Sequence, residues 1–144
     1  NGMEDMEAYA YAIGKKLDGT KAGHNPLLDP GNLADYMLII LSMGNKDAPL
    51  TSGGDRPNNW YAIRNRNSSE GFQFFIWDAE HSVLSYDIHQ DRTGPYLTGD
   101  NFEYSNPQYL WEQCIKNPEF RFLIKDRVHL HFNKGGSLHH NTLI

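Results

Sequence analysis

The sequence predicts an α+β fold that is mostly helical and carries one β-hairpin. Apolar residues recur every three or four positions in several segments, which is the spacing of amphipathic helices. Two strand-like runs, residues 60–64 and 71–77, are separated by a short polar turn and predict an antiparallel hairpin. The length of 144 residues fits one domain, so we expect residues 1–144 to form a single unit.

The first helix is predicted over residues 3–17, where apolar residues fall three or four positions apart among strong helix formers. Asp18 and Gly19 are expected to end it. Residues 20–31 are rich in glycine, proline and asparagine, which predicts a loop.

A second helix is predicted over residues 33–41, with Asp29 or Asn32 as its cap. Because nearly all of its residues are apolar, we expect this helix to be buried on almost every side and to be central to the fold. Gly44 ends it, since glycine adopts the left-handed conformation without a side-chain clash.

The C-terminal part predicts a long loop followed by two helices. Residues 81–105 lack periodicity, and a loop of that length implies function or mobility. Pro107 opens one short helix, in which we expect the single cysteine, Cys114, to be packed. Pro118 opens a longer amphipathic helix, whose apolar positions are Phe120, Leu123, Ile124, Val128 and Phe132.

Composition excludes several classes of function. The net charge is -5 and the basic residues are scattered among acidic ones, which argues against a nucleic-acid-binding surface. One cysteine cannot form an internal disulfide or a cysteine-rich zinc site. No apolar run approaches the ~20 residues of a membrane-spanning helix.

Four polar residues stand where apolar elements end: Asp47, Asn59, Asp78 and Glu80. A hairpin brings its two open ends together, so Asn59 and Asp78 are expected to be close neighbours. Carboxylate and amide oxygens are the ligands that Mg²⁺ prefers, with water and phosphate completing the shell. A loop aspartate, a later asparagine, a hairpin and a final aspartate are typical of kinase-like phosphoryl transfer.

Structural roles compete with this interpretation. Taken without its neighbouring motifs, Asp47 favours a turn in which it bonds its own backbone, and Asp78 has the alternative of a structural hydrogen bond at the end of a strand. Glu80 has the alternative of a solvated loop position. Trp60 and Trp77 are expected to be core rings rather than stacking platforms.

These residues fall into three motifs, which are Asn45-Lys46-Asp47, Asn58-Asn59-Trp60-Tyr61 and Trp77-Asp78-Ala79-Glu80. In this order and with an intervening hairpin, they resemble the CotH-type kinase family, the atypical protein kinases that include spore-coat protein H. The resemblance covers roughly residues 32–138. It implies a fold like the large lobe of a protein kinase.

The resemblance also implies roles for individual residues. Asp47 would be the catalytic aspartate that orients the substrate hydroxyl. Asn59, or less favourably Asn58, and Asp78 would hold Mg²⁺ or Mn²⁺ on ATP, with Glu80 as a second acidic group near the metal. The substrate would be a protein with Ser/Thr hydroxyls, and the location would be secreted or at the cell surface.

Nothing before Asn32 looks like the small lobe that supplies the ATP-binding lysine of a kinase. We therefore expect the chain to be the C-terminal lobe fragment of a CotH-like kinase domain, with the missing N-terminal lobe of the same parent chain as its partner. The fragment alone is expected to be inactive. The alternatives are a non-catalytic structural module and a carbohydrate- or Ca²⁺-binding module of a secreted or surface protein.

Overall fold

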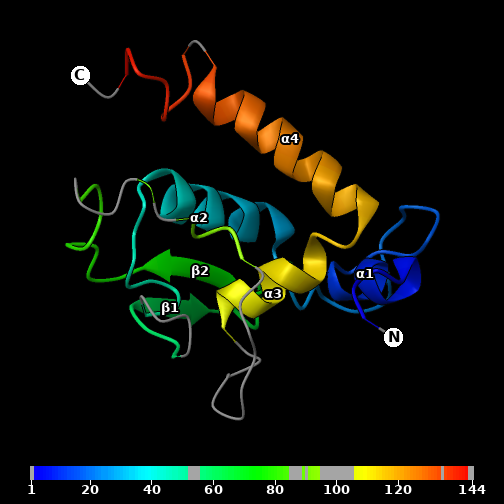
Figure 1. Ribbon diagram of the computed structural model, residues 1–144. Helices are drawn as coiled ribbons and strands as arrows, with labels where there is room; N and C mark the ends of the chain where they lie inside the picture. The colour runs from blue at the N-terminus through cyan, green and yellow to red at the C-terminus, as the bar shows by residue number, and fades with distance from the viewer. Residues whose placement is uncertain are drawn as a thin grey trace.

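The computed structural model describes residues 2–51, 56–84, 89, 91–94, 106–133 and 135–142. Over these residues the fold is α+β, with four helices and one antiparallel hairpin, which confirms the predicted class (Figure 1). The helices and strands in chain order are α1 (Met6–Ala12), α2 (Pro30–Ser42), β1 (Trp60–Ile63), β2 (Gln73–Ile76), α3 (Pro107–Cys114) and α4 (Pro118–Phe132).

Helix α2 is the centre of the fold, as the sequence predicts. It lies between the hairpin and α4 and also contacts α3 (Figure 1). Asp29 is its cap, because the Asp29 carboxylate accepts a hydrogen bond from the Asn32 N–H at 3.0 Å. Leu33 and Met37 are fully buried, whereas Ile39 is 36% exposed, so the helix is not buried on every side.

The hairpin presents one face to α2 and the other to solvent. Its register pairs Trp60 with Ile76 and Tyr61 with Phe75. Phe74 is buried against α2, and the Asn32 side chain of α2 bonds both the N–H and the carbonyl of Phe74, at 2.5 and 3.3 Å. A polar side chain of α2 therefore completes the hydrogen bonding of β2 at an edge where no third strand is found among the described residues.

Helix α1 is shorter than predicted. It begins after Asp5, whose carboxylate caps Glu7 and Ala8, and it ends at Ala12 rather than near Leu17. Gly14 has a positive φ of 70° and packs directly on Pro26, so the chain turns there. The apolar periodicity predicts a helix up to Leu17. The helix ends earlier because the carbonyls of Ala12 and Gly14 accept hydrogen bonds from N–H groups of residues 21–28.

Helix α4 is as long as expected but is less buried. Phe120 is fully buried, and Leu123 and Ile124 pack partly against the core. Val128 and Phe132 are 39% and 37% exposed, because the C-terminal half of α4 rises away from α2 (Figure 1). The expected amphipathic stripe is therefore used only along its first half.

Helix α3 buries Cys114 completely, which confirms that the thiol is packed. Burial raises the pKa of this thiol to about 12. None of the helices in the described ranges is long and apolar enough to cross a membrane. The predicted loop over residues 81–105 has no helix or strand among its described residues, and the others lie outside the description.

Candidate functional site

The loop that follows α2 is held from several directions. Gly44 ends the helix with a positive φ of 57°, as predicted. Asn45 is 1% exposed, and its Oδ1 accepts a hydrogen bond from the Asp47 N–H at 2.9 Å. The Lys46 N–H donates to the His81 carbonyl at 3.2 Å, across to the segment after β2. Asp47 is therefore presented by an ordered turn with its carboxylate half-buried.

Asn59 joins this turn to the open end of the hairpin. Its Nδ2 donates to Asp47 Oδ2 at 3.0 Å and to the Asp78 carbonyl at 3.4 Å. The Trp77 N–H donates to the Asn59 carbonyl at 3.2 Å, which extends the strand pairing to the hairpin mouth. The expected proximity of Asn59 and Asp78 is confirmed, and Asp47 lies against the same amide.

Both residues at the hairpin mouth have a positive φ. Asn59 has a φ of 50° and Asp78 a φ of 52°, in the left-handed region that residues other than glycine seldom occupy. Asparagine and aspartate are the side chains that tolerate this region best, which suits them to these two positions. These backbone conformations occur where Asp47, Asn59 and Asp78 come together.

Asp78 and Glu80 form an exposed pair of carboxyl groups. The hydrogen bond with Glu80, and then the negative charge of Glu80, raise the pKa of the Asp78 carboxyl above its ordinary value. The same hydrogen bond lowers the pKa of Glu80, against a small opposing effect of the Asp47 charge. The two shifts are opposite in direction, so Asp78 binds a proton more readily than Glu80 does. His81 Nε2 lies 3.5 Å from Glu80 Oε1.

The hairpin mouth carries oxygen atoms of the kind that a hard divalent cation binds. Asn59 uses Nδ2 in its two contacts, and neither of them occupies Oδ1, the atom that binds metals. Mg²⁺ is usually held by one or two carboxylates with phosphates and waters, not by an all-protein cage. Among the described residues, no group of three or more His, Cys, Asp or Glu side chains is placed so that it could hold a metal ion.

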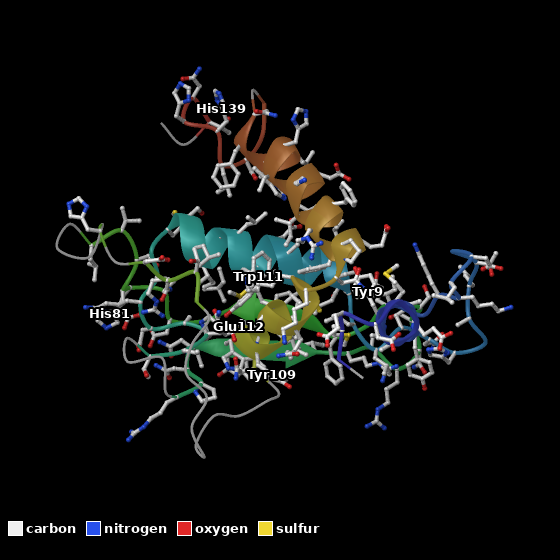
Figure 2. The ribbon with its side chains drawn as sticks, turned by 45° about the vertical axis from the view of Figure 1, so that its right-hand side comes forward. Tyr9, His81, Tyr109, Trp111, Glu112 and His139 are labelled. Carbon is white, nitrogen blue, oxygen red and sulfur yellow. The ribbon has the colours of Figure 1, made fainter. Side chains whose placement is uncertain are left out.

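Histidines of the C-terminal region lie away from this site. Figure 2 shows His81 near the hairpin mouth and His139 beyond the end of α4. His129 and His131 do not share a partner: His131 contacts Asp35 and Ser137, whereas His129 contacts Asn133. The two histidines are therefore held by different neighbours.

One tryptophan differs from expectation, and one arginine was not singled out from the sequence. Trp77 was predicted to be a core ring but is 57% exposed, stacked edge-on against Tyr61 at 5.4 Å on the outer face of the hairpin. Trp60 packs against the core, as predicted. Arg92 is buried, and its guanidinium donates to the Lys46 and Leu50 carbonyls. No sequence signal marks Arg92, because it lies within an aperiodic segment.

Comparison of the chain with protein-family models, with curated proteins and with solved structures returned no match.

Proposed function

We propose that this chain is the large lobe of an atypical protein Ser/Thr kinase of the CotH type, dependent on ATP and on Mg²⁺ or Mn²⁺. The observation that carries the proposal is the Asn59 amide, which contacts the Asp47 carboxylate and the Asp78 carbonyl at one hairpin mouth. Phosphoryl transfer depends mainly on positioning and charge neutralisation, so a small cluster held by hydrogen bonds suits it.

Within this cluster each residue has a distinct task. Asp47 orients the substrate hydroxyl, and its carboxylate accepts the hydroxyl proton. The Asn59 amide holds this carboxylate by a hydrogen bond. Asn59 Oδ1 and the Asp78 carboxylate hold the cation, and Glu80 adds negative charge beside it. When bound, the cation supplies positive charge that neutralises the ATP phosphates.

The proposed partner is an N-terminal lobe of the same parent chain, which carries the phosphate-binding lysine. Without that positive clamp, transition-state stabilisation falls by several kcal/mol. The 144 residues by themselves are therefore expected to bind the cation but not to transfer phosphate. Substrates are proteins with Ser/Thr hydroxyls, and the proposed location, secreted or at the cell surface, follows from the resemblance to the CotH-type family.

Calorimetry with Mn²⁺ and Mg²⁺ tests the proposed site. The wild-type chain is expected to bind Mn²⁺, and Asp78→Asn to weaken binding by about tenfold or more, because a carboxylate ligand is lost. Asp18→Asn is the matched control, since Asp18 is an exposed aspartate that bonds only its own turn among the described residues. Equal affinity of both variants and the wild type would refute the metal site.

Nucleotide and Ca²⁺ titrations separate the competing functions. A kinase lobe is expected to bind ATP only in the presence of Mn²⁺ or Mg²⁺. Tight Ca²⁺ binding with no effect of nucleotide would favour the Ca²⁺- or carbohydrate-binding module instead. Robust transfer from radiolabelled ATP by the isolated chain would show that no separate lobe is required.

A further inference from the structure

Arg92 is a buried basic residue that contacts the loop carrying Asp47. The residue as a whole is only 8% exposed. Nη1 donates to the Lys46 carbonyl at 2.6 Å, and Nη2 donates to the Leu50 carbonyl at 3.1 Å. Burying a guanidinium is costly unless hydrogen bonds compensate it, so these bonds are a substantial part of what holds Arg92 in place.

The two carbonyls flank Asp47 in the sequence. Lys46 immediately precedes Asp47, and Leu50 follows it by three positions, so one planar group ties both ends of the turn. The turn is also anchored at Pro49, whose carbonyl accepts from the Asn58 N–H at 2.9 Å. Arg92 thus acts on the same short stretch that the Asn59 region contacts from the other side.

We infer that Arg92 is a positioning residue: its guanidinium fixes the turn so that the Asp47 carboxylate stays against the Asn59 amide. The inference depends on the proposed function only for the catalytic role of Asp47. Both hydrogen bonds end on main-chain carbonyls, so Arg92 acts on Asp47 through the main chain, in the way that outer-shell hydrogen bonds orient metal ligands.

The geometry of the contact calls for arginine specifically. A guanidinium presents several N–H groups in a rigid plane and reaches two carbonyls at once, whereas a lysine ammonium is a single point on a flexible stem. Arg92→Lys therefore keeps the charge but is expected to release one of the two carbonyls. Arg92→Gln removes the charge and keeps one donor, which separates charge from geometry.

A matched control lies at the other end of the molecule. Arg121 is exposed and donates Nη1 to the carbonyls of Ile115 and Lys116 at 3.0 and 2.8 Å. Arg121→Lys disturbs the same kind of arginine–carbonyl contact far along the chain from Asp47. A loss seen with Arg92→Lys but not with Arg121→Lys is therefore a property of the site.

Two readouts test the inference on the full 144-residue chain. The first is NMR of the Asp47 backbone N–H and of the Asn59 side-chain amide, which report the turn directly. The second is calorimetry with Mn²⁺. Arg92→Lys and Arg92→Gln are expected to shift the Asn59 amide, to speed exchange of the Asp47 N–H, and to weaken Mn²⁺ binding by about 10- to 100-fold.

The outcomes distinguish this inference from the proposed function. If the wild-type chain does not bind Mn²⁺, the proposed function fails, and the NMR signals alone decide the role of Arg92. Unchanged Asp47 and Asn59 signals in both Arg92 variants would overturn the inference, even if the melting temperature fell. Unfolding of both variants at 20 °C would also overturn it, because Arg92 would then serve the stability of the whole domain.

Discussion

The attachment of α4 to α2 is expected to depend on one carboxylate, that of Asp35. Arg127 of α4 donates to Asp35 through both Nε, at 2.6 Å, and Nη2. His131, one turn further along, places Nε2 2.9 Å from Asp35 Oδ1. Because the C-terminal half of α4 buries little apolar surface, these contacts are its main attachment to α2 in the described structure. Asp35→Asn is predicted to loosen this attachment.

The size of the effect follows from partial burial. The Asp35, Arg127 and His131 side chains are 25%, 29% and 21% exposed. Exposed ion pairs contribute about 0.2 to 1 kcal/mol, whereas removing one partner of a buried pair costs about 3 to 5 kcal/mol. An intermediate loss of about 1 to 2 kcal/mol is expected, which corresponds to a fall of about 3 to 6 °C in the melting temperature.

The loss has a defined dependence on pH. Burial raises the pKa of the Asp35 carboxyl, but the hydrogen bonds and charges of Arg127 and His131 outweigh burial and hold that pKa below its ordinary value. A lowered folded-state pKa means that the stabilisation is complete above the unfolded value of about 3.9. It is lost as the pH falls through the folded-state value. Wild type and Asp35→Asn should therefore converge as the pH falls from 5 toward 2.

Urea unfolding followed by circular dichroism at pH 5, 4 and 3 measures this difference. Asp126→Asn is the control, because Asp126 lies exposed on the same helix. It should change the free energy of unfolding by no more than about 0.5 kcal/mol. A difference between wild type and Asp35→Asn that stays constant over this pH range would refute the role of the ionised carboxylate. Equal stability at pH 5 would refute the attachment itself.

Two further predictions concern burial. Burial raises the pKa of the Cys114 thiol to about 12. At pH 8 a thiol reagent should therefore label Cys114 in urea but not in the native protein. Rapid labelling of the native protein would contradict this. Trp111→Ala is expected to cost about 3 to 5 kcal/mol, since Trp111 is 7% exposed, while Trp77→Ala should cost less than about 1 kcal/mol at 57% exposure. Equal losses by urea unfolding would contradict the burial of these rings.

The elements that were predicted well are those with local signals. Helix α2 combines a capping aspartate, a proline in its first turn and a terminal glycine, and each of these acts within a few residues. The hairpin follows from two aromatic runs and a polar turn. Helix α1 was predicted too long, because Gly14 packs against Pro26, and a contact between distant residues leaves no mark in local periodicity.

The candidate site was predictable for a similar reason. Once a hairpin is inferred, its open ends must meet, so the proximity of Asn59 and Asp78 follows from the strand pairing. The resemblance assigned Asp47 and Asn59 to one site but did not predict a contact between them, and in the structure Asn59 Nδ2 lies 3.0 Å from Asp47 Oδ2. The direction of the Trp77 ring was not predictable, because nothing local says that the outer face of the hairpin lacks a covering element.

By itself, the sequence determined the α+β class, the central helix, the hairpin and the four polar residues at the ends of apolar elements. Only the tertiary structure decided that Arg92 ties the Asp47 turn, that Asp35 anchors α4 and that Trp77 faces solvent. The physical reason is how far apart the interacting residues lie along the sequence. Caps, turns and periodicity act between residues a few positions apart, whereas Arg92 and Asp35 reach partners 42 to 96 residues away, where only packing of the whole chain can bring them.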